Sequence, residues 1–152
     1  MTTNGLIFLI AQFKLTVQSN AIQSTSLSYE YIVNEDPALK GKPIIGFPFK
    51  AGSSLTIYSY ESEVDCIALD WTVNLNWAIK NINPSIVIQG NLDPASLIPE
   101  NSHFLNEHVL SILDIMKDKK FIFNVGHGIT PECKIDNVKK VVNIVNTYKS
   151  DY

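Results

Sequence analysis

One histidine of this chain lies in a setting that favours chemistry. His127 is flanked by Gly126 and Gly128 and directly follows an apolar segment. An imidazole exchanges a proton near neutral pH and both donates and accepts hydrogen bonds, so it serves in acid–base catalysis and in ligand binding. Flanking glycines let the backbone approach a ligand closely. The same tripeptide is equally compatible with a turn that has no chemical role, and the residues alone leave both interpretations open.

Other polar side chains follow apolar segments, and for these a structural role is expected. Asp70 ends one apolar segment, and we expect it to cap the next helix or to hold a loop. Asn91 and Asp93 lie in a later turn, where bonding between side chain and backbone is the ordinary explanation. The two tryptophans, Trp71 and Trp77, are expected to pack rather than to form a binding platform.

The histidine and cysteine positions do not favour a metal site. Cys66 and Cys133 are far apart and form no CxxC motif, so neither a zinc knuckle nor a disulfide scaffold is predicted. His103 and His108 are five residues apart, which misses the i, i+4 spacing that places two ligands on one helix face. We expect both histidines to be solvated, and we expect no bound metal.

Composition limits the class of protein. The 152 residues are 45% hydrophobic and 18% charged, with a formal net charge of −3, which predicts one globular domain over residues 1–152. No cluster of basic residues indicates nucleic-acid or anionic-membrane binding. The apolar run from Leu6 to Ala11 is short and has no basic segment before it, so neither a signal peptide nor a membrane span is predicted, and a cytoplasmic location is expected.

The basic residues have an unusual composition. All twelve are lysines, and the sequence contains no arginine. The chain therefore lacks the planar guanidinium that binds carboxylates in a bidentate manner.

Four short segments predict buried strands, because each is continuously apolar, as in parallel sheets covered on both faces. They are Pro43 to Pro48, Cys66 to Trp71, Ser85 to Asn91 and Phe121 to Gly126, with Ala21 to Thr25 as a weaker fifth. Loops at the carboxyl ends of such strands carry the chemistry of α/β folds. His127, Asp70 and Asn91 are all expected in such loops.

Helical patterns separate the strands. Thr72 precedes a short amphipathic pattern that ends at Ile82, a second pattern covers Phe104 to Met116, and a third follows Asp136, which is expected to cap it. The alternation of strands and helices predicts either a doubly wound sheet or part of a (β/α)8 barrel. A whole barrel needs about 250 residues, so this chain would form a little over half of one.

Three motifs together resemble the uroporphyrinogen decarboxylase family. They are Leu-Asp-Trp-Thr-Val at 69–73, Gln-Gly-Asn-Leu-Asp-Pro at 89–94, and Phe-Asn-Val-Gly-His-Gly at 123–128 with Pro131 and Glu132 following. Their order and spacing fit the family, and the strand at 43–48 with Ala51 and Gly52 resembles its preceding segment. The resemblance covers residues 42–148.

The resemblance implies a fold and an activity. Members of the family form a (β/α)8 barrel, work as homodimers, and remove carbon dioxide from the four acetate arms of uroporphyrinogen to give coproporphyrinogen, without metal or organic cofactor. The chain is then expected to be the C-terminal half of such a barrel, with four or five parallel strands. His127 matches the family's late active-site histidine, which implies a catalytic and substrate-binding role, and Ser26 resembles a remnant of its active-site serine.

The resemblance also implies that something is missing. The family's aspartate, arginines and tyrosine belong to its N-terminal half, and no residue here matches them. We therefore expect a truncated chain that is inactive alone, with a tetrapyrrole as ligand and either a homodimer partner or a complementary N-terminal half. The alternatives are a non-catalytic remnant or binding module, and a relative of zinc-dependent methyltransferases, although their His-x-Cys pair is absent.

Overall fold

The fold is a parallel sheet with helices between its strands. The computed structural model describes residues 43–149. Its four strands lie in the order of the chain: β1 (Ile45–Gly46), β2 (Cys66–Ala68), β3 (Val87–Leu92) and β4 (Phe121–Val125). Every neighbouring pair is parallel. This confirms the predicted α/β class and agrees with part of a (β/α)8 barrel. The fifth strand expected at Ala21 to Thr25 lies outside the described residues.

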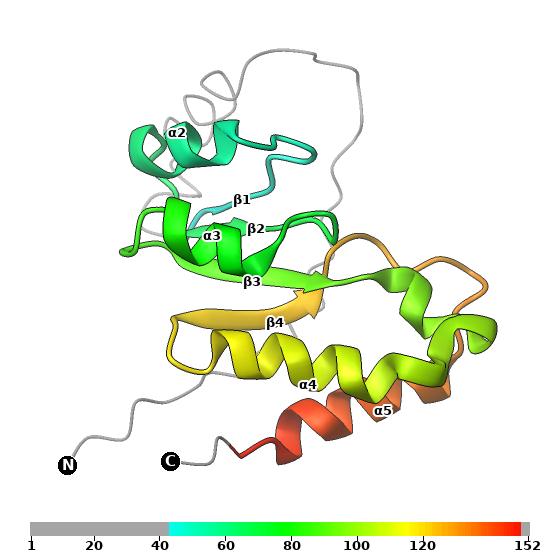
Figure 1. Ribbon diagram of the computed structural model, residues 1–152. Helices are drawn as coiled ribbons and strands as arrows, with labels where there is room; N and C mark the ends of the chain where they lie inside the picture. The colour runs from blue at the N-terminus through cyan, green and yellow to red at the C-terminus, as the bar shows by residue number, and fades with distance from the viewer. Residues whose placement is uncertain (1–42, 150–152) are drawn as a thin grey trace.

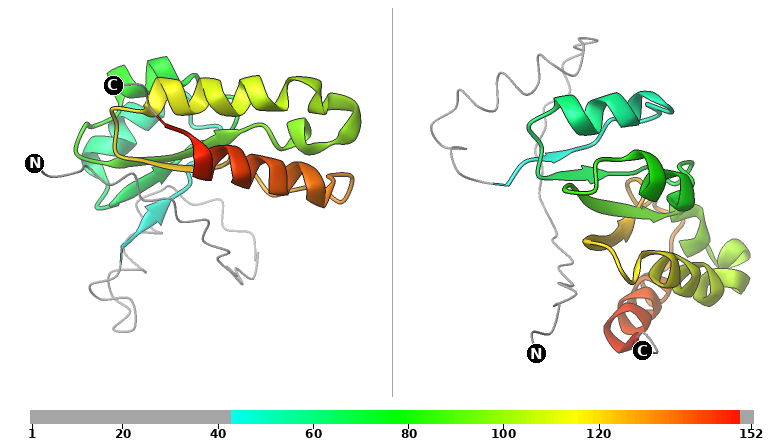
Figure 2. Two further views of the ribbon diagram at one scale, coloured as in Figure 1. Left: turned by 90° about the horizontal axis from the view of Figure 1, so that it is seen from below. Right: turned by 60° about the vertical axis from the view of Figure 1, so that its left-hand side comes forward.

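A helix follows each strand, and all four helices lie on one side of the sheet (Figures 1 and 2). They are α2 (Ser54–Glu61), α3 (Leu75–Asn81), α4 (Leu105–Met116) and α5 (Ile135–Thr147). Two 3-10 helices, η1 (Pro94–Leu97) and η2 (Pro99–Phe104), connect β3 to α4. Helices α2 and α3 lie nearer β1 and β2, whereas α4, which contacts β3, and α5 lie on the side of β4 (Figure 1).

Two buried clusters hold the helices against the sheet. In the first, Ile67 of β2 and Ile88 of β3 pack with residues of α2, α3 and α4. In the second, Leu105, Val109 and Leu113 of α4 pack with residues of β3 and α5. Burial of each such side chain stabilises the fold by about 1.5–3 kcal/mol.

The other face of the sheet belongs to neither cluster. Ala68, Gln89 and Ile122 are register partners across β2, β3 and β4, and none of the three is a member of a helix-side cluster. Strand residues alternate between the two faces. The described sheet therefore has one face covered by helices and one that faces away from them, as the wall of a barrel would.

One helix begins later than expected, and one expected helix cap is wrong. Helix α3 begins after Asn74, whose Oδ1 accepts from the backbone N–H of Trp77 at 3.0 Å, and Thr72 instead bonds Asp70. Helix α5 begins after Lys134, so Asp136 lies inside its first turn. A carboxylate in the first turn still interacts favourably with the helix dipole. None of the helices among residues 43–149 is long and apolar enough to cross a membrane.

Candidate functional site

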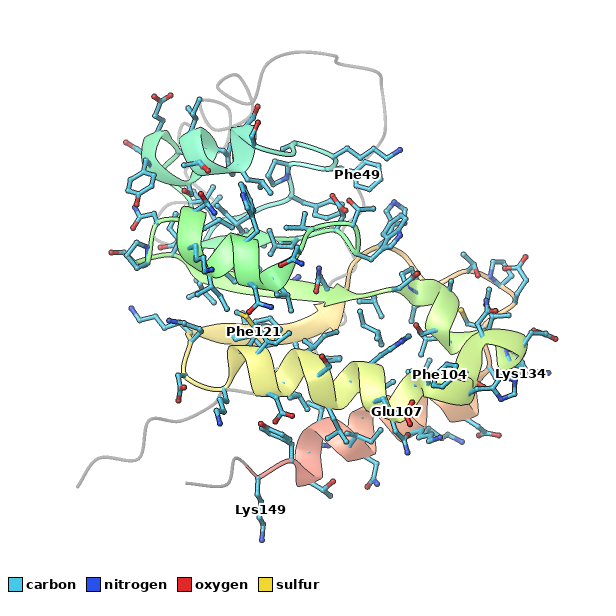
Figure 3. The ribbon with its side chains drawn as sticks, in the orientation of Figure 1. Phe49, Phe104, Glu107, Phe121, Lys134 and Lys149 are labelled. Carbon is cyan, nitrogen blue, oxygen red and sulfur yellow. The ribbon has the colours of Figure 1, made fainter. Side chains whose placement is uncertain are left out.

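The polar residues predicted to lie together do so, at the carboxyl ends of the strands. Asp70 follows β2, Asn91 lies near the end of β3, and His127 follows β4. Figure 3 shows Phe49 on the loop after β1, at the end of the sheet toward which the strands run. Parallel strands bring these loops to one edge, which is where barrel enzymes place their chemistry.

His127 lies among three aromatic rings. Its ring centroid is 5.4 Å from that of Phe49, 5.6 Å from that of Trp71 and 6.4 Å from that of Phe47. We call these four residues the aromatic cluster. The Trp71 ring meets the imidazole edge-on, at an interplanar angle of 87°, which is a favourable arrangement of two π systems.

The aromatic cluster is open to solvent. Phe47, Phe49 and Trp71 are 45%, 42% and 37% exposed, and His127 is exposed as well. Apolar ring faces beside an imidazole can stack on a planar ligand while the imidazole donates a hydrogen bond or transfers a proton. A contiguous patch of exposed aromatic side chains commonly marks a binding surface.

The exposure of Trp71 corrects an expectation. Trp77 packs against the first buried cluster, as a structural tryptophan would, but Trp71 is exposed and contacts Phe49 and His127. Phe47 and Phe49 were not recognised from sequence as part of a site. Only their position after a strand distinguishes them from core phenylalanines. The rings of Trp71 and His127 that they meet are 22 to 80 residues away in the chain.

Gly126 allows the loop after β4 to approach the loop after β2. A Cβ atom at this position would lie 2.9 Å from Trp71 Cα and 3.0 Å from the carbonyl carbon of Asp70. Both are backbone atoms, so a larger residue would push the loops apart. The first glycine of the Gly-His-Gly turn therefore serves close packing, and it brings His127 beside Trp71.

Asp70 connects two loops through its carboxylate. The side chain is 2% exposed. Oδ1 accepts from the backbone N–H of Thr72 at 2.8 Å and from the Thr72 hydroxyl, and Oδ2 accepts from the backbone N–H of Lys50 at 3.1 Å. Burial alone would raise the pKa of this carboxyl, but the bonds from Thr72 and Lys50 and the charge of Lys50 outweigh burial and lower it.

Asn91 of β3 bonds the loop that follows β2. Its Nδ2 donates to the carbonyl oxygens of Asp70 and Val73, at 3.0 and 2.8 Å. Asp93 accepts from the backbone N–H of Ala95 at 2.8 Å and so begins η1. Asp93 thus bonds the backbone of its own turn, as expected for a turn residue of its type. Asn91 was also expected in a turn, but it lies within β3 and bonds the backbone of a loop 18 and 21 residues away.

Lys50 is the lysine beside the aromatic cluster. Its ammonium group lies 5.3 Å from the Phe49 ring centroid, within the range of a cation–π interaction. Lys50 also lines a cavity of about 380 Å³, together with Asp70, Thr72 and Trp77. No member of the aromatic cluster lines that cavity.

The remaining candidates lie elsewhere. Ser26 is outside the described residues. His103 and His108 are exposed, and Cys133 donates its thiol to the Pro94 carbonyl oxygen at 3.5 Å. Among residues 43–149, no group of three or more potential ligands is arranged to hold a metal ion.

Comparison with known proteins identifies similar sequences. The family model "Uroporphyrinogen decarboxylase (URO-D)" matches residues 23–148. Proteins named uroporphyrinogen decarboxylase are similar to this chain: one from Orientia tsutsugamushi is 37% identical over 129 residues, and one from a Wolbachia of Drosophila simulans is 34% identical over 163 residues. A third, from Rhodospirillum rubrum, is 39% identical over 105 residues.

The matches cover most of this chain but less than half of each relative. They include 85%, 97% and 69% of this chain, and 36%, 47% and 30% of the Orientia, Wolbachia and Rhodospirillum proteins. Both the aromatic cluster and Asp70 lie within the matched residues.

Proposed function

Because this chain belongs to the uroporphyrinogen decarboxylase family, we propose that it supplies one wall of a uroporphyrinogen-decarboxylating site and is active only when other barrel strands complete that site. The observation that carries the proposal is the position of His127, at the carboxyl end of a parallel sheet and among three exposed aromatic rings. These rings offer apolar surface to pyrrole rings, and the imidazole offers a hydrogen bond or a proton.

The reaction requires more than these groups. Each acetate arm of the substrate loses carbon dioxide, and a proton takes its place on the remaining carbon. Such a site must bind the negatively charged arms, stabilise charge on the pyrrole and deliver the proton. Lys50 offers a positive charge to the arms, and His127 of the aromatic cluster offers a proton. These residues therefore meet the first and third requirements in part. The sequence has no arginine for the bidentate binding of carboxylates.

The open sheet gives the proposal its structural basis. In the described residues, β1 and β4 each pair with a single neighbouring strand, whereas a closed barrel of this type has eight strands. Unpaired strand edges associate readily with other strands. We propose that residues 1–152 form a single domain in the cytoplasm, and that its partner is a complementary barrel half. A second copy of this chain is the alternative partner.

A non-catalytic binding module is the second candidate function. The absence of arginine from the whole sequence favours it, because lysines alone bind carboxylates as point charges. Such a module would bind the tetrapyrrole, and addition of a complementary barrel half would produce no turnover.

Binding tests the role of His127 without requiring turnover. Uroporphyrin, the oxidised form of the substrate, is titrated into the full chain and its fluorescence is followed. His127→Ala is expected to weaken the affinity about tenfold, the effect of losing one hydrogen bond of about 1–1.5 kcal/mol. His103→Ala removes an exposed histidine outside the aromatic cluster and should leave the affinity unchanged. An equal affinity for the His127→Ala variant would contradict the assignment.

A further inference from the structure

The two carboxylate oxygens of Asp70 bond residues of two different loops, whereas a turn residue needs bonds only within its own loop. Oδ1 bonds only Thr72, two residues away in the same loop, whereas Oδ2 bonds the backbone of Lys50 in a different loop. The Oδ2 bond thus joins segments that are twenty residues apart. One oxygen shapes the β2 loop, and the other fixes the position of the β1 loop against it.

The backbone conformation of Lys50 indicates that the bond to Asp70 Oδ2 holds the β1 loop in place. Lys50 has a φ angle of +56°, a left-handed conformation that residues other than glycine seldom adopt. Such a conformation persists where surrounding contacts hold it. The bond from the Lys50 N–H to the buried Asp70 carboxylate, at 3.1 Å, is a contact of this kind.

The two loops joined by the Oδ2 bond contain two of the rings around His127. Phe49 directly precedes Lys50, and Trp71 directly follows Asp70. Their ring centroids are 6.0 Å apart, and each lies within 5.6 Å of the imidazole centroid. A change in the distance between the two loops would therefore change the space in which the imidazole lies.

We propose that Asp70 is a positioning residue for His127: its Oδ2 holds the β1 loop against the β2 loop so that Phe49 and Trp71 flank the imidazole. The role of this arrangement in decarboxylation rests on the function proposed above. The arrangement itself does not, because it is a property of the chain without ligand. The hydrogen bonds of the Asp70 carboxylate go to Lys50 and Thr72, so Asp70 acts on the aromatic cluster through the backbone of the two loops.

The chain offers a pair of variants that separate the two oxygens. Asp70→Asn keeps an oxygen for Thr72 but can place an amide N–H against the Lys50 N–H, which removes the bond between the loops. Thr72→Val removes the hydroxyl bond within the β2 loop and leaves the carboxylate free to bind Lys50. A role confined to the β2 turn predicts similar effects of both variants, whereas the clamp predicts different ones.

The readout is the NMR signal of the His127 ring protons in the full chain without ligand, because neighbouring aromatic rings shift these signals. We expect Asp70→Asn to move the His127 ring signals toward random-coil positions and to weaken the nuclear Overhauser effects between His127 and the rings of Phe49 and Trp71. Thr72→Val should leave both close to wild type. An Asp70→Asn spectrum in which His127 keeps its wild-type shifts and contacts would overturn the proposal.

A second measurement decides the question if Asp70→Asn does not fold. In the wild-type chain, the clamp requires slow hydrogen exchange of the Lys50 amide, because its N–H is bonded to a buried carboxylate. Exchange as fast as that of an unstructured loop amide would overturn the proposal. Neither measurement uses a tetrapyrrole, so failure of uroporphyrin to bind would count against the proposed function and would leave the clamp intact.

Discussion

At the scale of single residues, the candidate site depends on how closely the loops approach one another. The two carboxylate oxygens of Asp70 accept hydrogen bonds from two different loops. Asn91 donates to two carbonyl groups of the β2 loop, and Gly126 lies against the Trp71 backbone. These contacts place His127 among the rings of the aromatic cluster. Each contact can be tested by a change of one or a few atoms.

The two glycines beside His127 should respond differently to a methyl group. At Gly126 the added Cβ would press on backbone atoms of Trp71 and Asp70, whereas at Gly128 nothing lies within 4 Å of it. We expect Gly126→Ala to lower the free energy of unfolding by about 1–3 kcal/mol, as overpacking does. Gly128→Ala should change it by less than about 0.5 kcal/mol. Urea denaturation of the two variants measures both, and equal stabilities would show that the loops are not in close contact.

The lowered pKa of Asp70 predicts a loss of stability in acid. Hydrogen bonds to the carboxylate stabilise its charged form in the folded chain, so its folded pKa lies below its unfolded pKa. The resulting stability is present above the ordinary aspartate pKa of about 4 and is lost as pH falls through the lower folded value. Thermal unfolding as a function of pH checks this. The stability difference between wild type and Asp70→Asn should shrink below pH 4, and a difference that grows there would contradict the prediction.

At the scale of elements, the sequence was most informative where a pattern reflects burial. The four strands were located from continuous apolar segments, and α4 and α5 from apolar residues at helical spacing. Helix α2 was not located, because Ile57 and Tyr60 are 60% and 62% exposed and its apolar residues do not gather on one face. The start of α3 was misplaced because Thr72 and Asn74 are both suitable caps, and only the three-dimensional position of Asp70 engages Thr72.

The candidate site was predictable only in part for a similar reason. The glycines mark His127, and strand ends mark Asp70 and Asn91, so the position of these three residues at the carboxyl end of the sheet was predicted. The catalytic and substrate-binding role of His127 stays a prediction. Phe47, Phe49 and the exposed face of Trp71 come together through contacts between loops that are distant in sequence. Contacts between distant loops produce no periodic pattern in the sequence, so they could not be predicted from it.

Helix α4 should tolerate truncation on one face and not on the other. Leu105 is completely buried in the second cluster, whereas Leu110 is 40% exposed on the same helix. We expect Leu105→Ala to lower the free energy of unfolding by about 2–5 kcal/mol, because it leaves a cavity among buried side chains. Leu110→Ala makes the same chemical change near the surface and should cost well under about 1.5 kcal/mol. Denaturant unfolding compares them, and similar losses would contradict the two-faced packing of α4.

At the scale of the whole molecule, the described strands form an open sheet with one face away from the helices. The chain matches less than half the length of its relatives from Orientia, Wolbachia and Rhodospirillum. In the described residues it presents an edge at β1 and another at β4. The proposed dependence of the His127 site on other strands rests on these features.

The most direct test of the proposed function is coproporphyrinogen formation from uroporphyrinogen by the purified chain, alone and mixed with the N-terminal part of the Orientia relative that precedes the matched region. Light scattering on the same samples reports association. We predict no product from either polypeptide alone, and product together with a complex in the mixture. Turnover by the homogeneous chain alone would contradict it, and a folded mixture that associates without turnover would favour the non-catalytic module instead.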